Sequence, residues 1–308
     1  AAAAGGGGQQ QQQLVARNVF YLGDLAGEDA AAVGLINVAT FLSQAMAESI
    51  AAGSCDEINE DMVDGSLPAS NSCGQFGQSY QDMTCSDDER FMECNVYSDM
   101  EMGANPNGRP MAPFYCGSTE RFPFTGTADY IAGRAPVDAP VPNQNGRTDV
   151  EACCWWGRGT ISTRGVCQYG KLNYYLGARA AQEGRPARYP NIDFCVSPQA
   201  ICSSQQQDSS IEWVSGLFRW MDDVQSYVSY NEDGGVEWSY IEKLHEFVAG
   251  GMTDGLFIHS VSSIVTQGCY NAPCPGYTGE QMTDAGERWS YFLQVLEALG
   301  LPVKALQS

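Results

Sequence analysis

The sequence predicts a mainly α-helical protein whose helices flank one long loop region stapled by disulfides. Apolar residues recur at helical spacing in one segment before residue 55 and in five segments after residue 153. Between them, residues 55–150 are rich in Gly, Pro, Asn, Asp and Ser and hold five of the twelve cysteines. The chain has no internal repeat and no alternating strand–helix pattern, so neither a solenoid nor a doubly wound sheet is expected.

The first predicted helix covers residues 33–49 and stops at Gly53. Glu48 falls near its end, at the margin of its apolar face. Four residues at helical spacing define that face: Leu35, Val38, Leu42 and Met46.

Five further helices are predicted in the second half of the chain. They cover residues 171–181, 211–227, 238–248, 254–266 and 284–299. Ser209 or Ser210 is placed to cap the second of these, and Gly250 and Gly300 follow the ends of the third and the last. Four tryptophans on apolar helix faces are expected in the core: Trp213, Trp220, Trp238 and Trp289.

The cysteines indicate disulfides and an oxidising compartment. Their number is even, and none forms the paired C-x-x-C spacing of a zinc site. The only two histidines, His245 and His259, lie in separate predicted helices, so no metal and no other cofactor is expected. The low-complexity run at residues 1–13 is set apart from the folded domain, which covers residues 14–308.

Charge and hydropathy exclude two classes of partner. A formal net charge of −21 repels nucleic acid and anionic lipid. No uncharged apolar run reaches the ~20 residues needed to cross a bilayer, and the longest, residues 30–42, contains Asn37. A neutral polymer is an acceptable ligand.

Several motifs resemble the glycoside hydrolase family 19 chitinases. The segment Cys-Cys-Trp-Trp-Gly-Arg-Gly-Thr-Ile-Ser at 153–162 resembles the family's Tyr-Gly-Arg-Gly-Pro-Ile-Gln, and Gln-Tyr-Gly at 168–170 resembles Asn-Tyr-Gly. Residues 41–49, residues 217–221, and residues 264–269 with a later Arg288 follow in the family's order. The resemblance implies a bilobal, lysozyme-like helical fold in which residues 55–150 form a longer, disulfide-rich loop insertion.

The resemblance also implies an inverting mechanism with two carboxyl groups. Glu48 occupies the place of the general acid, which must be partly buried to keep its proton. Glu120, four residues after Cys116, is the first candidate for the general base, with Glu89 and Glu93 as alternatives. The residues expected to bind or support substrate are Trp156, Arg158, Ser162, Arg164, Gln168, Tyr169, Thr266 and Arg288.

The side chain of Arg288 has two readings. It matches the family's late arginine and is expected to support the cleft carboxylates, or it is a first-turn helix residue with no special task. Aromatic platforms for sugar rings would come from Trp155, Trp156, Tyr169 and Tyr174.

The sequence departs from the family at positions that matter for chemistry. Ala47 replaces the histidine before the acid, and Arg164 replaces the serine that helps to hold the attacking water. A guanidinium is larger than a hydroxyl and always charged, so it would pair with a nearby carboxylate instead of orienting water. Gln168, Ser162 and Thr266 replace the family's asparagine, glutamine and asparagine–glycine site.

Two functions are therefore predicted for a secreted or cell-surface protein. The first is an inverting chitinase that cleaves β-1,4-linked N-acetylglucosamine polymer. The alternative is a pseudoenzyme that binds chitin or a related polysaccharide, or that serves as a structural subunit with partners in an extracellular assembly.

Overall fold

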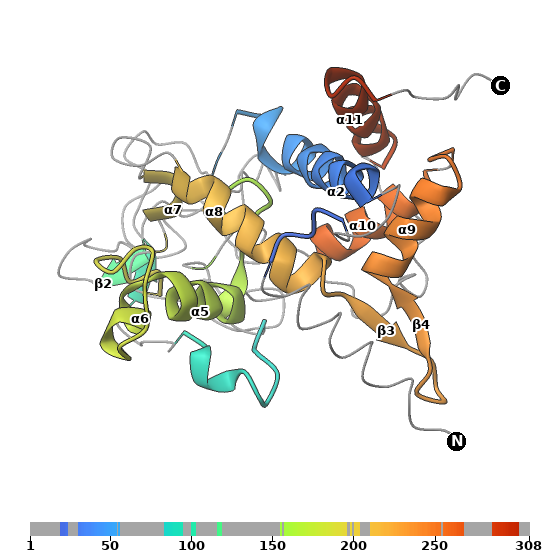
Figure 1. Ribbon diagram of the computed structural model, residues 1–308. Coiled ribbons are helices and arrows are strands. Elements are labelled where there is room, and N and C mark those ends of the chain that lie inside the picture. The colour runs from blue at the N-terminus through green and yellow to red at the C-terminus, as the bar shows by residue number, and fades with distance from the viewer. Residues whose placement is uncertain are drawn as a thin grey trace, which may run out of the picture. The chain divides into compact units, whose positions relative to one another are not determined.

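A computed structural model describes residues 19–23, 30–53, 55, 83–94, 100–102, 116–118, 155, 157–195, 198, 200–203, 210–253, 255–267 and 285–301. In these residues the fold is mainly α-helical, as predicted, with two short strand pairs (Figure 1). The chain divides into two compact units. We call them the helical unit (Ala1–Ala52 with Leu217–Ser308) and the disulfide unit (Gly53–Gly216).

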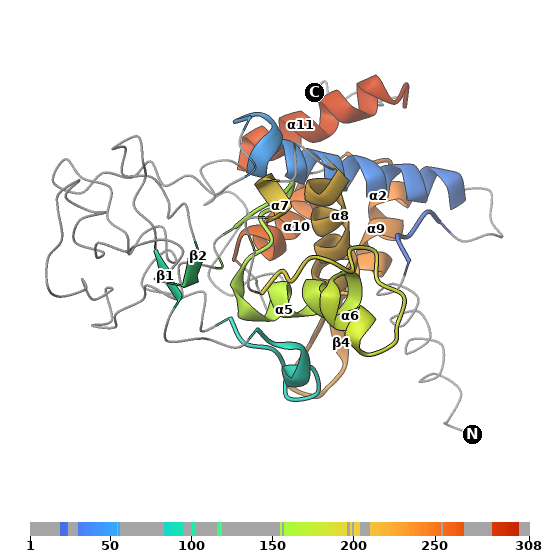
Figure 2. The same cartoon turned by 90° about the vertical axis from the view of Figure 1, so that its left-hand side faces the viewer.

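The helical unit is built around one apolar helix. Helix α2 (Ala30–Ala45) continues without interruption into a π-helical turn, η1 (Met46–Ile50), and the chain then turns at Gly53 with a φ of +62°. Helices α9 (Tyr240–Ala249), α10 (Leu256–Gln267) and α11 (Ala285–Ala298) pack against α2, and Figure 2 shows α11 running beside it. The predicted first helix is confirmed, with the π-turn as an unforeseen addition.

The buried face of α2 differs from the predicted one. Leu35 is 39% exposed, and Val38, Leu42 and Met46 are only half-buried. Buried instead are apolar residues on several sides of the helix and four polar ones between them: Val33, Ile36, Ala39, Phe41, Ala45, Asn37, Thr40, Ser43 and Gln44. Several neighbours surround the helix and bond its polar side chains, so one apolar stripe does not describe its burial.

Asn37 is the centre of a buried hydrogen-bond network in the helical unit. Its side-chain oxygen accepts bonds from Trp220 Nε1 (3.1 Å) and the Tyr240 hydroxyl (2.6 Å). Its amide nitrogen donates to the carbonyl of Tyr21 (2.8 Å) and to Oε1 of Gln225 (3.1 Å). The network joins α2 to α9 and to the segment at residues 19–23, and it satisfies the polar atoms that α2 buries.

By length and composition alone, the helix Ala31–Ile50 could cross a membrane. From the sequence, we considered only the uncharged run at residues 30–42, which is too short to do so. However, 61% of this helix is buried within the protein, and Asn37 and Gln44 bond to neighbouring elements. These are the properties of the core helix of a folded unit.

A β-hairpin stands where the sequence predicted the start of a helix. Strand β3 (Val228–Tyr230) pairs antiparallel with β4 (Val236–Ser239), and α9 begins only at Tyr240. The turn is closed by a bond from the Asn231 amide to the carbonyl of Gly235 (2.8 Å), and Gly234 takes a φ of +77°. The Asp-Gly-Gly sequence at 233–235 was the turn signal that could have predicted it.

The other helices predicted after residue 210 are confirmed with small shifts. Helix α8 (Ser210–Arg219) and the π-turn η7 (Trp220–Val224) cover the second predicted helix, and α11 is followed by Gly300 with a φ of +68°. Of the four tryptophans expected in the core, Trp220 and Trp238 are buried, whereas Trp213 and Trp289 are half-buried.

The disulfide unit contains shorter elements. They are the 3-10 turn η4 (Arg90–Met92), the antiparallel strands β1 (Met100–Met102) and β2 (Cys116–Ser118), and helices α5 (Gly165–Leu176), α6 (Ala178–Gln182) and α7 (Ala200–Ser203). The helix predicted at 171–181 was wrong in its bounds. It begins earlier and breaks at Gly177, where a Cβ would lie 2.7 Å from the carbonyl oxygen of Ile192.

Among the described residues, three disulfides hold this unit together. They are Cys55–Cys202, Cys85–Cys167 and Cys94–Cys195, with sequence separations of 147, 82 and 101 residues respectively. The prediction of disulfides is confirmed for these six cysteines. Each bond ties a cysteine before residue 95 to one beyond residue 160, and such long closed loops restrict the unfolded chain.

Candidate functional site

Glu48 lies in the π-turn η1 at the end of α2. The turn is closed by the backbone bond from Ala51 to the carbonyl of Met46 (3.0 Å), and Ser49 Oγ donates to the carbonyl of Ala45 (3.2 Å). A π-turn widens the helix by one residue and is found frequently at functional sites. It changes the direction of the Glu48 side chain relative to a regular continuation of α2.

Arg288 of α11 binds Glu48 directly. Its Nη2 donates to Glu48 Oε1 at 2.6 Å, across a sequence separation of 240 residues. The Arg288 side chain is 3% exposed and that of Glu48 is 10% exposed. The two side chains therefore form a short, nearly buried ion pair.

A chain of hydrogen bonds fixes the other side of the guanidinium. Arg288 Nη1 donates to Gln44 Oε1 (2.7 Å), and Gln44 Nε2 donates to Ser262 Oγ (3.0 Å). Ser262 Oγ in turn donates to the carbonyl of Ile258 (2.7 Å). Gln44 and Ser262 are fully buried, so α2, α10 and α11 are locked together around Arg288.

A second buried arginine, the last residue of α8, contacts the last turn of α10. Arg219 is 3% exposed and donates from Nη2 to the carbonyl of Val265 at 2.6 Å, while its Nε lies 3.5 Å from Asp223 Oδ2. A cation at the last turn of a helix satisfies carbonyls that have no helical partner. Thr266 lies beside this contact, and its hydroxyl donates to the carbonyl of Ser262 (2.9 Å) within its own helix.

In the disulfide unit, residues 158–163 form a tight turn. Arg158 and Thr163 exchange two backbone hydrogen bonds (3.0 and 2.8 Å), and Gly159 has a φ of +81°. Ser162 has a φ of +57°, which is uncommon for a residue other than glycine. Such backbone conformations often occur at functional sites, and the predicted role of Ser162 in binding stays a prediction.

The predicted binding residues next to this turn are mostly buried. Arg158 and Tyr169 are both fully buried, and Arg158 Nη1 donates to the Tyr169 hydroxyl at 3.0 Å. Trp155 is also fully buried, so its ring offers no platform to a ligand. Arg164 and Gln168 are half-buried, at the start of α5 and one turn into it. Contact of Arg158 or Tyr169 with sugar is a prediction that their burial does not favour.

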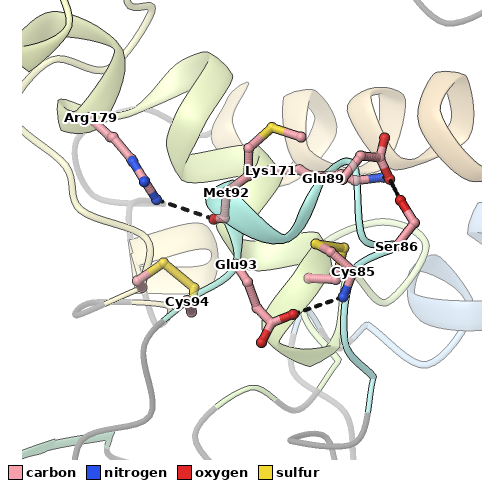
Figure 3. The surroundings of a disulfide bond; sticks show 10 residues. Cys85, Ser86, Glu89, Met92, Glu93, Cys94, Lys171 and Arg179 are labelled. Carbon is pink, nitrogen blue, oxygen red and sulfur yellow. Dashed lines mark hydrogen bonds and ion pairs between the residues drawn. A yellow bond between two sulfur atoms is a disulfide. The ribbon is translucent and has the colours of Figure 1, made fainter.

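The two alternative bases are engaged in contacts within the disulfide unit (Figure 3). Glu89 Oε2 lies 2.8 Å from the Nζ of Lys171 and accepts a bond from Ser86 Oγ (3.1 Å). Glu93 Oε2 accepts a bond from the backbone amide of Cys85 (2.9 Å). These contacts give both carboxylates a role in holding the segment at 83–94.

The first candidate for the base, Glu120, and the predicted binding residue Trp156 lie outside the described residues. The distance between the two carboxyl groups is therefore a prediction. In the part of the chain that the structure describes, no group of three His, Cys, Asp or Glu side chains is arranged to hold a metal ion. His245 is hydrogen-bonded through Nε2 to the Tyr21 hydroxyl (2.8 Å).

No protein-family model, no curated protein and no solved structure matches this chain. The contact between Glu48 and Arg288 is therefore the observation that can support a functional proposal. Sequence reasoning named both residues but missed Gln44 and Ser262, whose side chains complete the cluster. Polar residues in an apolar helical pattern were the signal that could have found them.

Proposed function

We propose that the chain is a secreted, chitinase-like glycoside hydrolase that cleaves β-1,4-linked N-acetylglucosamine polymer with inversion. The observation that carries the proposal is the 2.6 Å contact between Glu48 and Arg288. The resemblance to family 19 chitinases singled out these two residues, from opposite ends of the chain, as acid and electrostatic support. A chance resemblance would give no reason for these two side chains to be in contact.

The π-turns give a second line of support. The resemblance singled out residues 41–49 and 217–221, and the two π-turns, η1 and η7, begin within those segments. Because π-turns are rare and concentrate at functional sites, their position favours a site in the helical unit. The bilobal, lysozyme-like fold belongs to the same proposal, and the division into two compact units supports it.

The geometry also defines what catalysis requires of Glu48. A general acid must carry a proton, whereas Glu48 forms an ion pair with Arg288. Gln44 and Ser262 fix the guanidinium, so Glu48 is the member of the pair that has to move when substrate binds. In the proposed mechanism, the bound sugar turns Glu48 away from Arg288, and the released carboxylate takes a proton from solvent. The carboxyl group then gives this proton to the glycosidic oxygen of the leaving sugar, while Glu120 accepts a proton from the water that attacks the anomeric carbon.

The proposal is tested with chitohexaose as substrate and protein whose disulfides are intact. Glu48→Gln should lower turnover by roughly 10²–10⁴-fold, since it removes general acid catalysis. Glu287→Gln is the matched control, because Glu287 is an exposed carboxylate next to Arg288 and bonds Tyr291. A wild-type protein without turnover, or equal losses in both variants, would contradict the proposal.

The same ion pair favours a second candidate function, a non-catalytic chitin-binding or structural protein. The guanidinium of Arg288 occupies one carboxyl oxygen of Glu48, and Ala47 stands where the family has a histidine. A binder would retain chitin without cleaving it, and Glu48→Gln would leave its affinity nearly unchanged. In either function the three disulfides support an oxidising, extracellular environment.

A further inference from the structure

Three aromatic rings lie side by side in the disulfide unit, and two of them are exposed. Phe91 of η4 is 56% exposed and Tyr175 of α5 is 46% exposed, with Tyr174 between them. The Tyr174 ring centroid lies 5.3 Å from that of Phe91 and 5.1 Å from that of Tyr175. Both outer rings stand at 83° to Tyr174, so neither of them is stacked on the central ring. We call these three residues the aromatic platform.

Two arginines brace the platform. The Arg185 guanidinium lies 3.7 Å from the centroid of the Tyr174 ring and donates to the carbonyl of Tyr174. Arg179 lies 5.6 Å from the same ring and donates from Nη2 to the carbonyl of Phe91 (2.5 Å). Its Nη1 reaches the carbonyl of Met92, as Figure 3 shows. The central ring and the turn that carries Phe91 are thereby fixed to one another.

One carboxylate offsets part of the charge of these arginines. Glu183 accepts two bonds from Arg185 (3.2 and 3.0 Å) and lies 3.5 Å from the Nε of Arg179. Desolvation raises the pKa of the Glu183 carboxyl, but hydrogen bonds from Arg185 and Tyr174 and the two arginine charges outweigh it and lower the pKa. The carboxylate therefore stays ionised and paired, and the two arginines and Glu183 together keep one net positive charge.

The disulfides add rigidity on both sides of the platform. Cys85–Cys167 and Cys94–Cys195 tie the segment at 83–94 to α5 and to the loop beyond α6. Gly170 permits the close approach, because a Cβ there would lie 2.3 Å from the carbonyl oxygen of Met92. Ligand binding to such a preorganised surface costs little conformational entropy.

We propose that Phe91, Tyr174 and Tyr175 form a second carbohydrate-binding surface, built from the disulfide unit alone, which holds the pyranose rings of insoluble chitin. The exposed rings of Phe91 and Tyr175 suit the apolar faces of sugars, and the two arginines and the carboxylate offer hydrogen bonds to sugar hydroxyls. The choice of chitin as the polymer rests on the proposed function. The platform itself does not depend on whether Glu48 is catalytic.

The experiment measures retention of the full-length protein on chitin beads. Phe91→Ala and Tyr175→Ala should each weaken retention roughly tenfold, a loss of ~1.4 kcal/mol, and leave turnover of soluble chitohexaose unchanged. Tyr230→Ala is the matched control, because Tyr230 is 53% exposed on β3, away from the platform residues in the sequence, and should change retention less than twofold, within ~0.4 kcal/mol. Circular dichroism confirms that each variant is folded.

Three results would overturn the platform. They are a wild-type protein that chitin beads do not retain, platform variants retained as well as Tyr230→Ala, and a dimer in solution that Phe91→Ala dissociates, since a second copy would then cover the rings. The proposed hydrolase can fail separately. Weaker retention of the platform variants, in a protein that cleaves nothing, would support the platform and contradict the catalytic role of Glu48.

Discussion

The carboxylate of Glu48 and the guanidinium of Arg288 are both largely removed from water. The attraction between them offsets the free-energy cost of burying each charge. Arg288→Ala leaves Glu48 as a nearly buried charge without its partner. We expect it to lower the free energy of unfolding by about 3–5 kcal/mol, as for other broken buried ion pairs. Chemical denaturation measures the loss. Lys243→Ala, which breaks an exposed pair with Glu246, serves as the control and should cost less than ~1 kcal/mol.

Tyr240 gives a pH dependence whose sign follows from its burial. Desolvation raises the pKa of the buried Tyr240 hydroxyl well above 10.0, and a hydrogen bond with Thr40 opposes the shift only in part. The folded state keeps the proton longer than the unfolded state, so the stabilisation is complete below pH ~10 and is lost as pH rises above it. At neutral pH, Tyr240→Phe should be less stable than the wild-type protein, because Asn37 loses a hydrogen bond. Between pH ~9 and ~11, about one unit on either side of the ordinary tyrosine pKa, the variant should lose less stability than the wild-type protein.

A thermal unfolding series across that pH range checks this prediction. Equal slopes for the wild-type protein and Tyr240→Phe would contradict it. Tyr230→Phe is a suitable control, since the Tyr230 ring is exposed.

Single residues show how far sequence reasoning reached. Glu48 and Arg288 could be predicted because they lie in motifs with a recognisable order. Gln44 and Ser262 could not, because their bond depends on the register of α2 against α10, which no local pattern encodes. The burial of Arg158 and Tyr169 was not predicted either, because it too depends on packing that no local pattern encodes.

At the scale of elements, the segment at residues 19–23 is held against α2 by close backbone contact. A Cβ at Gly34 would lie 2.1 Å from the carbonyl oxygen of Leu22. Gln225 holds the same segment, since its Nε2 donates to the carbonyl of Val19 (2.7 Å) and its Oε1 accepts from the amide of Tyr21 (2.7 Å). The segment therefore packs as a part of the helical unit.

Gly34→Ala should displace this segment and lower stability, although alanine is the better helix former. Gly286→Ala in α11 is the matched control, because a Cβ there meets nothing within 4 Å. The control should raise stability by roughly 0.5–1 kcal/mol. Differential scanning calorimetry compares the two, and a stabilised Gly34→Ala would show that the segment does not lie against α2.

Helix existence was easier to predict than helix bounds. The periodic segments at 254–266 and 284–299 became α10 and α11 within a few residues, because apolar residues recur through both and glycine follows the second. The hairpin β3–β4 was missed, since tryptophan and tyrosine suit strands as well as helices. Helix α5 was misplaced because its start depends on packing around Gly165 and Gly170.

At the scale of the molecule, the disulfides should contribute a large part of the stability of the disulfide unit. The bond Cys94–Cys195 closes a separation of 101 residues. Replacing both cysteines with serine should lower the free energy of unfolding by about 4–5 kcal/mol, on the chain-entropy account. Urea denaturation of the variant and of the wild-type protein measures the difference, and a loss below ~1 kcal/mol would mean that packing alone holds the segment at 83–94.

The sequence predicted that disulfides would replace regular structure in the loop region, but not which cysteines pair. Twelve cysteines permit too many connectivities for spacing to decide, and pairing follows from the folded positions of residues up to 147 apart. The mainly helical class, by contrast, follows from periodicity alone and is confirmed.

The proposed function depends on one chemical event, the inversion at the anomeric carbon that Glu48 assists. We would follow the first products of chitohexaose cleavage by NMR, before the anomers equilibrate, with wild-type protein and with Glu48→Gln. An inverting hydrolase gives α-anomer products with the wild-type protein and none with the variant. β-Anomer products, or retention of chitin with no cleavage at all, would contradict the proposed function and favour a retaining enzyme or a binding protein respectively.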